Sequence, residues 1–500
     1  MAATAETPKT FYLETFGCQM NVHDSERVAG TLMAHGYTPV ETMQEAGLIL
    51  FNTCSIRDKA AQKVFDRLAN FKALKKQGKT FGVLGCVAQQ EGEAIFKRAP
   101  HVTLVAGSAS YARLPELIAQ LEAGEPRVTG LGEAPEEAFE TEFTRRDHPY
   151  RAYVTIIEGC DKHCAYCVVP YTRGGERSRA SASVLAEVAS LVAMGYTEVQ
   201  LLGQNVNSYR DPSPAKLNFA ELLTAVGEVR GLKRVRYTTS HPRDFTPAIV
   251  RAMGANPVLC DHVHLPVQSG SNRVLDRMRR GYSREQYLEI IADIHACPRP
   301  LAITTDIIVG FPGETDADFE QTAEMMHAVR YSGAFIFKYS PRPHTEAGAW
   351  GAGSDDIPDA VKTERLMILQ RRQQELQLED NQAWVGRNLE VMVEAYHPKL
   401  NQWAGRSSSN RVVNFSSSLP APVAAPPALA ILGQTAPTTA PLPRNALDPG
   451  AYVQVQIDKA GPNSFVGQHL DGRGPQLGWA ERPAYAHSGS GPHSPKPELR

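Results

Sequence analysis

The chain has 500 residues, of which 42% are hydrophobic and 21% are charged, a composition that excludes collagen-like, fibrous and wholly disordered proteins. Lysine and arginine number 52 and aspartate and glutamate 54, which gives a net charge of -2. This overall charge does not indicate binding to nucleic acid or to a membrane surface, so either kind of binding would need a local patch of positive charge. The first nine residues lack the features of a signal peptide and no apolar run is long enough to cross a bilayer, so we expect a cytoplasmic protein without membrane segments. Because cytosolic thiols stay reduced, the eight cysteines are expected to bind metal or act in catalysis where they cluster.

The amino-terminal part of the chain contains three strand-like segments that each end at a cysteine. The pairs are residues 11–17 with Cys18, residues 48–53 with Cys54, and residues 81–85 with Cys86. Helical stretches at residues 24–35 and 58–76 lie between them, so the pattern predicts a parallel α/β sheet. Ligands bind at the carboxyl edge of such sheets, which predicts that the three thiols share one crevice.

The central part alternates six strand-like segments with helical sequence, after a charged linker. The segments are residues 152–157, 198–206, 234–240, 262–267, 302–309 and 334–339. Six strand–helix units predict an incomplete (β/α)6 barrel, whose active site lies at the carboxyl ends of its strands.

The last part begins with a charged helical segment at residues 357–382. Strand-like residues at 388–395, 410–414 and 451–457 then indicate a small antiparallel β-barrel of a kind that binds RNA. The predicted organisation is an amino-terminal α/β domain at 9–125, a linker at 126–148, the partial barrel at 149–382, the small barrel at 383–470 with a Pro- and Ala-rich loop insertion at 419–449, and a disordered tail at 471–500.

The most informative motif is the run Cys160, Cys164 and Cys167 directly after the first barrel strand. Three thiolates on one short loop can bind three irons of a 4Fe-4S cluster and leave the fourth iron open to another ligand. The alternative is a zinc knuckle in which His163 is a fourth ligand, but structural zinc sites usually use paired elements and no second pair is present. Cys260 has no partner at ligand spacing, nor has Cys297, and we expect both to be structural thiols.

This spacing, with the aromatic Tyr166 before the last cysteine, resembles the radical S-adenosylmethionine (SAM) enzymes. The resemblance implies that the open iron binds SAM and that one electron from the cluster cleaves it to methionine and a deoxyadenosyl radical. Residues 17–21, 52–57 and 85–90 further resemble the amino-terminal domain of the methylthiotransferases. In that family the three cysteines, here Cys18, Cys54 and Cys86, hold an auxiliary 4Fe-4S cluster that carries the sulfur. The alternative is that each of the three is a buried structural cysteine.

Within the methylthiotransferases, four segments are similar to the MiaB-like branch that modifies tRNA and differ from the branch that modifies a ribosomal protein. They are residues 159–179, 202–209, 240–242 and 264–271. The resemblance covers residues 11–470 and identifies the small barrel as an RNA-binding TRAM domain, although the insertion and the tail depart from the family pattern. It implies methylthiolation at C2 of the N6-isopentenyladenosine 3' of the anticodon, in which one SAM methylates the sulfur and a second supplies the radical.

The same resemblance implies two 4Fe-4S clusters and SAM as cofactors. It also implies the tRNA anticodon stem-loop as substrate, flavodoxin or ferredoxin as electron donor, iron–sulfur carrier proteins as further partners, and a monomer. Two enzymatic alternatives keep the chemistry and change the substrate, to threonylcarbamoyladenosine in tRNA or to an aspartate of a ribosomal protein. An alternative of another class is a non-catalytic iron–sulfur protein that binds RNA.

Five polar or aromatic residues at the expected strand ends are candidates for binding SAM, namely Tyr166, Gln204, Asn205, Gln268 and Asp306. Each can equally be an ordinary hydrogen-bonded side chain of the interior. Two groups of arginines, at residues 173–179 and 277–284, are interpreted as a basic rim that holds phosphates at the barrel mouth.

Overall fold

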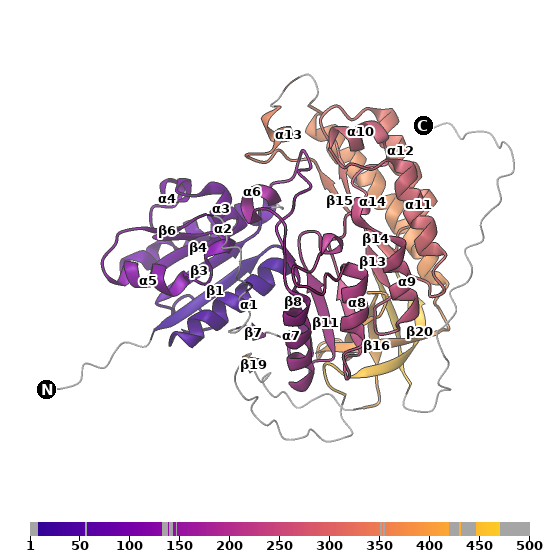
Figure 1. The fold of residues 1–500 in the computed structure, drawn as a ribbon, viewed down its shortest axis with the longest axis horizontal. Coiled ribbons are helices and arrows are strands. Elements are labelled where there is room, and N and C mark those ends of the chain that lie inside the picture. The colour runs from indigo at the N-terminus through magenta and orange to yellow at the C-terminus, as the bar shows by residue number, and fades with distance from the viewer. Residues whose placement is uncertain are drawn as a thin grey trace.

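The computed structural model describes residues 9–55, 58–132, 139, 144–146, 148–350, 353, 356–419, 430–431 and 447–470. Figure 1 shows an amino-terminal α/β unit beside a larger barrel, with a small β-barrel at one end of the latter. Part of the predicted linker, most of the predicted insertion and the whole predicted tail lie outside the described residues. No described helix is both long and apolar enough to cross a membrane.

The amino-terminal unit is a parallel sheet of six strands in the order β2-β1-β3-β4-β5-β6. The strands are β1 Thr10–Phe16, β2 Thr38–Pro39, β3 Leu48–Thr53, β4 Thr80–Gly85, β5 Leu104–Ala106 and β6 Val128–Gly130. Strand β3 is buried along its whole length because helices cover both faces of the sheet. One face carries α1 Gln19–Ala34 and α5 Leu114–Glu122, and the other carries α2 Asp58–Phe71, the 3-10 helix Lys72–Gln77, α3 Cys86–Glu91 and α4 Ala94–Arg98. The predicted α/β sheet is confirmed.

The central unit is the predicted incomplete barrel of six parallel strands. They are β8 Arg151–Thr155, β11 Glu198–Leu202, β12 Arg234–Tyr237, β13 His262–His264, β14 Ala302–Val309 and β15 Gly333–Lys338. They form two three-stranded sheets, β8-β11-β12 and β13-β14-β15, joined through the contact of β12 with β13. The helices that follow the strands are α7 Ser181–Ala193, α8 Phe219–Gly227, α9 Pro247–Ala255, α11 Arg284–His295, α12 Asp316–Val329 and α14 Asp359–Gln382.

Short elements lie at the carboxyl ends of these barrel strands. They are β9 Ile157–Glu158 paired with β10 Arg177–Ser178, and the helices α6 Val169–Arg173, α10 Asn272–Arg277 and α13 Glu346–Ala349. Three predicted strands run three or four residues beyond the observed ones, because the chain leaves the sheet at Leu202, Tyr237 and His264 to form the loops of this edge.

The small barrel is closed, with the strand order β16-β17-β18-β21-β20. Its strands are β16 Asn388–His397, β17 Gln402–Ser407, β18 Val412–Ser416, β20 Tyr452–Ala460 and β21 Ser464–His469. The expectation of a wholly antiparallel barrel is wrong in one ladder, since β18 and β21 pair in parallel. A closed ring of five strands must contain at least one parallel pair, because strand directions cannot alternate around an odd number. The two-stranded β19 Ala430–Ile431 with β7 Arg145–Arg146 lies apart from it.

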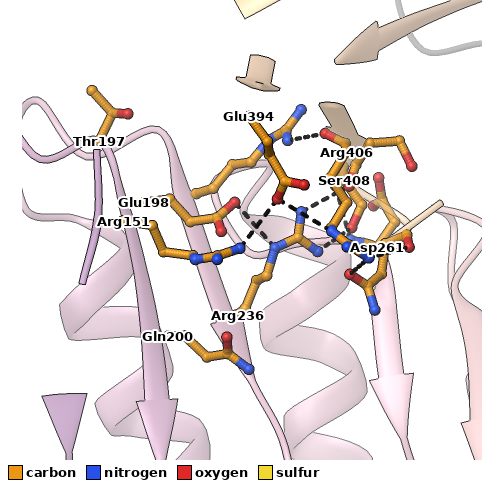
Figure 2. A network of polar contacts seen from close by, with 12 residues as sticks. Arg151, Thr197, Glu198, Gln200, Arg236, Asp261, Glu394, Arg406 and Ser408 are labelled. Carbon is orange, nitrogen blue, oxygen red and sulfur yellow. Dashed lines mark hydrogen bonds and ion pairs between the residues drawn. The ribbon is translucent and has the colours of Figure 1, made fainter. Parts of the chain in front are cut away.

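The small barrel covers the amino-terminal ends of the central strands. Arg236 of β12 donates from Nε to Glu198 at 3.0 Å and from its Nη atoms to the carbonyl oxygens of Ser407 and Ser408 at 2.7 and 3.0 Å (Figure 2). Arg151, at the start of β8, pairs with Glu394 of β16 at 3.2 Å. The carboxyl ends of the central strands, where the cysteine motif lies, are therefore at the end opposite the small barrel.

Candidate functional site

The loop that carries Cys160, Cys164 and Cys167 is fixed by backbone hydrogen bonds. Cys160 N–H donates to the carbonyl of Gly174 at 3.1 Å, and Cys167 N–H donates to the carbonyl of Cys164 at 2.9 Å. His163 in the middle of the loop has a φ of 45°, an uncommon left-handed conformation for a residue other than glycine. These bonds and this backbone angle give the loop a defined shape.

The described side chains around this loop do not form the close group of donors that a single metal ion needs. Within the described part of the chain, no three His, Cys, Asp or Glu side chains gather closely enough to hold one metal ion, so the zinc alternative with His163 gains no support. Each cysteine of a four-iron cluster binds a different iron, which sets its thiols further apart. All eight cysteines are free thiols, as expected. Burial raises the pKa of Cys160 to about 11 and that of Cys167 to about 12.

A buried arginine stands directly beside this loop. Arg280 donates from Nη1 to Cys164 Sγ and to Tyr166 Oη, both at 3.3 Å, from Nη2 to the Pro266 carbonyl at 3.1 Å and from Nε to Tyr282 Oη at 3.3 Å. Only 5% of Arg280 is exposed, and none of these four acceptors is a carboxylate. A buried cation without an anionic partner is costly, and a cluster held by thiolates would supply the missing negative charge.

The five candidate SAM residues lie around the carboxyl ends of the barrel strands, but their side chains differ in the contacts that they already make within the protein. Gln204 Oε1 accepts from Gly159 N–H at 2.5 Å, and Asn205 Nδ2 donates to Asp244 at 2.7 Å. Gln268, at a φ of 69°, makes its backbone bonds with β14, next to Asp306, whose carboxylate lies 3.5 Å from His264. The ring of Tyr166 packs edge-on against Phe311.

Several buried polar atoms at this edge have no hydrogen-bond partner within the described part of the chain. They are Thr155 Oγ1, Gln204 Nε2, Asn205 Oδ1, Ser240 Oγ, His241 Nε2 and Gln268 Oε1. These atoms come from the ends of four successive strands, β8, β11, β12 and β13, whereas buried polar groups are normally paired. A polar ligand lying across the strand ends would satisfy them, which fits the amino acid and ribose parts of SAM. Sequence reasoning missed Thr155, Ser240 and His241 as members of this set.

The three amino-terminal cysteines also come together at a strand edge. They follow β1, β3 and β4, which are neighbours in the sheet with Phe16 opposite Thr53 and Thr53 opposite Gly85. A hydrogen bond with Cys54 lowers the pKa of Cys18 to about 6, and Cys18 Sγ also contacts Asn21 Oδ1 at 3.1 Å. Cys86 begins α3, after Gly85 at a φ of 87°.

Several polar atoms of this part of the sheet also have no hydrogen-bond partner among the residues that the structure describes. They are Asp24 Oδ1, Thr53 Oγ1, Ser55 Oγ, Gln89 Oε1 and Gln90 Oε1, all buried. Glycine is required beside them, since a Cβ at Gly17 would lie 2.2 Å from the Cβ of Cys54 and one at Gly85 would lie 2.3 Å from Asn52 Oδ1. The donor set and the open polar atoms fit a bound group here too.

The two cysteine groups are joined by direct packing of α3 on α6. Helix α6 begins two residues after Cys167, and α3 begins with Cys86. Arg173 at the end of α6 forms an ion pair with Asp24 of α1 at 2.5 Å, and only 5% and 1% of the two side chains are exposed. The groups therefore face each other across one interface.

The basic rim predicted from the two arginine groups is wrong for three of their members. Arg173 pairs with Asp24, Arg179 is buried against Glu187, and Arg280 is buried beside Cys164. The arginines are close in sequence, but inside the protein their guanidinium groups pair with acidic side chains and hydrogen-bond acceptors of other segments. Cys260 and Cys297 are buried, and the structural role expected of them stays a prediction.

Known proteins resemble this chain closely. Residues 10–107 match the uncharacterized protein family UPF0004, and residues 154–326 match the radical SAM superfamily. The chain is 58% identical over 464 residues to the tRNA-2-methylthio-N(6)-dimethylallyladenosine synthase of Solibacter usitatus, which covers 93% of this chain and 98% of that protein. The protein of the same name from Koribacter versatilis is 56% identical over 463 residues, with 92% and 98% covered.

A solved structure shares the fold. The radical S-adenosylmethionine methyltransferase TsrM from Kitasatospora setae aligns with a TM-score of 0.53 at 14% identity, over 70% of this chain and 78% of that chain. At this identity the likeness shows the arrangement of the chain alone.

Proposed function

This chain belongs to the tRNA-2-methylthio-N(6)-dimethylallyladenosine synthase family of radical SAM methylthiotransferases, and from this premise we propose that it replaces the C2 hydrogen of an N6-isopentenyladenosine in tRNA with a methylthio group. The observation that carries the proposal is the pair of cysteine groups, each at the carboxyl edge of a parallel sheet and facing the other across α3 and α6. The reaction needs both a radical and a sulfur donor, and each of the two cysteine groups can serve one of these needs.

Cys160, Cys164 and Cys167 would hold the radical 4Fe-4S cluster, which supplies the electron for SAM cleavage when bound. Arg280 would balance the charge of the cluster at Cys164, and its bond to Tyr166 would fix that ring for contact with adenine. The separate loop after a barrel strand supports a reactive rather than a structural role, since a structural site needs no open iron.

The unpartnered polar atoms at the strand ends would bind SAM. Gln204 would anchor the cysteine loop through Gly159 and present Nε2 to the ligand, and Asn205 would present Oδ1. Gln268 and Asp306 would contact SAM from β13 and β14.

Cys18, Cys54 and Cys86 would hold the auxiliary cluster. The lowered pKa of Cys18 keeps its thiol ready for iron at neutral pH. Buried Asn21 and Asn52, bonded to each other at 3.2 Å, would keep the sulfur site in shape.

Further parts of the proposal concern organisation and partners. We assign residues 9–125 to the auxiliary-cluster domain, 149–382 to the radical SAM domain and 383–470 to a TRAM-like domain that binds the tRNA, in a cytoplasmic monomer. A flavodoxin or ferredoxin would supply electrons and iron–sulfur carriers would supply the clusters. The closed five-stranded barrel supports the RNA-binding role, because small barrels of this kind recur in RNA-binding proteins.

The test is product analysis with anaerobically reconstituted protein, SAM and dithionite. Anticodon stem-loops that carry isopentenyladenosine, threonylcarbamoyladenosine or unmodified adenosine are compared with a ribosomal-protein peptide that contains aspartate. We expect a 2-methylthio nucleoside, detected by mass spectrometry, only from the first RNA. Product from another substrate would reassign the specificity, and absence of SAM cleavage with reduced clusters would favour a non-catalytic RNA-binding protein.

A further inference from the structure

The small barrel lies too far from the cysteine loop to account for RNA binding at that end of the larger barrel, so other residues must contact the RNA there. The small barrel covers the amino-terminal ends of the central strands, whereas the cysteine loop lies at their carboxyl ends. Helices α6 and α13 lie away from the small barrel (Figure 1). Any residues that hold nucleotides beside the reacting base must therefore come from this other end.

An open groove of about 500 Å³ lies between α6 and the loop that follows β15. Its lining includes Tyr171 of α6 and the run Pro341, Arg342, Pro343 and His344. A volume of this size falls within the range of about 300–1000 Å³ that is typical of small-molecule sites.

The groove opens onto the cysteine loop. A smaller cavity of about 170 Å³ is lined by Cys164, Cys167, Tyr171 and Glu346, and the two cavities share Tyr171 and Glu346 in their walls. The groove wall is fastened to the loop by the hydrogen bond from Ala347 N–H to the Ala165 carbonyl at 2.8 Å. A ligand bound in the groove would therefore lie next to a ligand bound at the thiols of Cys164 and Cys167.

The chemistry of the lining favours an unpaired nucleotide. Tyr171 is 52% exposed although it is a large aromatic residue, and its ring lies 6.3 Å from that of His344 at an angle of 39°. Exposed rings stack on bases of single-stranded RNA, and an arginine such as Arg342 suits a phosphate. His344 has a φ of 65°, a conformation that side chains rarely adopt and that is often retained at binding sites.

We propose that this groove, with Tyr171, Arg342 and His344, binds an unpaired nucleotide of the RNA next to the one that reacts. The inference rests on the proposed function, since it takes the substrate to be RNA. An anticodon loop offers such nucleotides, because its bases are not held in a duplex and can be splayed onto aromatic side chains.

The first test is photo-crosslinking with the reconstituted, unreduced enzyme in the presence of SAM. Anticodon stem-loops carry a photoreactive uridine at one loop position at a time, and mass spectrometry maps the crosslinked residue. We expect a position adjacent to the target adenosine to crosslink to Tyr171 or His344. Crosslinks from every position that map only outside residues 171 and 341–349 would overturn the proposal.

The second test is RNA affinity measured by fluorescence anisotropy. Tyr171→Ala should weaken binding roughly 5- to 140-fold, which corresponds to about 1–3 kcal/mol for one stacked base. Tyr171→Phe keeps the ring and should stay near the parent. Iron content equal to the parent shows that each variant is intact.

The outcomes separate the groove from the proposed function. Crosslinks at the groove without methylthiolated product would support the groove and count against the proposed reaction. Normal product with unchanged RNA affinity in Tyr171→Ala and no groove crosslinks would overturn the groove alone. Protection of the groove by the ribosomal-protein peptide, with no RNA crosslinks there, would also overturn it.

Discussion

The ion pair between Arg173 and Asp24 should hold the two cysteine groups in register, and Arg173→Met tests this directly. Both side chains are almost fully buried, so the substitution leaves the Asp24 carboxylate without its partner, in a site where one of its oxygens already has none. Breaking a buried pair in this way costs about 3–5 kcal/mol. We expect α3 and α6 to separate locally, because they pack together at this point.

Hydrogen–deuterium exchange measures the effect better than global unfolding, which is not a two-state process in a protein with several domains. A loss of about 3–5 kcal/mol should speed the exchange of α3 and α6 peptides roughly 100- to 4000-fold. Replacing both residues, as Arg173→Met with Asp24→Leu, should recover most of the protection, since apolar pairs of similar volume often replace a buried ion pair without loss.

Two results would refute this reasoning. One is an exchange rate in α3 and α6 that changes less than about tenfold in Arg173→Met. The other is a double variant that exchanges as fast as the single one, which would mean that Arg173 acts through packing rather than through the charge of Asp24.

Three more predictions follow from other buried polar side chains. Arg280→Met removes a cation beside Cys164 and should make the radical cluster harder to reduce, seen as a more negative midpoint in an EPR-monitored redox titration; an unchanged midpoint would contradict the charge role. Burial lowers the pKa of His23 to about 3, so stability should fall as pH drops below about 6.5, where only the unfolded chain gains the proton; in His23→Gln the thermal midpoint should fall less steeply over that range, and an equal slope would count against it. Arg236→Met should cost about 3–5 kcal/mol by stranding buried Glu198 and should speed exchange in the small barrel, while Arg230→Met should not; equal behaviour would refute it.

Strands with a continuous apolar run could be predicted from the sequence, whereas two strands of the small barrel could not. Strand β3 matches the predicted residues 48–53, because its apolar run fits a parallel strand covered on both faces. Strands β17 and β21 were missed, since Gly405 and Gly467 interrupt their patterns. A Cβ at these glycines would lie 2.4 Å and 2.1 Å from the carbonyl oxygens of Met392 and Gln456, a close approach that no local pattern reveals.

Some features of the candidate site could also be predicted from the sequence, and others could not. The positions of the cysteines after strands could be read from the sequence, because a motif and its preceding strand are adjacent in the chain. The fate of Arg173 could not, since its partner Asp24 lies 149 residues earlier. Nor could the left-handed conformations of Thr239 and Gln268, which have φ angles of 69° and shape the strand-end loops, because neither residue type signals a positive φ.

The central claim is that two separate cysteine groups hold two clusters with different tasks. The most direct measurement is iron and sulfide per chain, with SAM cleavage, for the parent and for two triple variants that replace Cys160, Cys164 and Cys167 or Cys18, Cys54 and Cys86 with alanine. We predict that each variant keeps about half of the iron of the parent and that only the second still cleaves SAM. Loss of all iron in either variant, or zinc in place of iron in the parent, would contradict the claim.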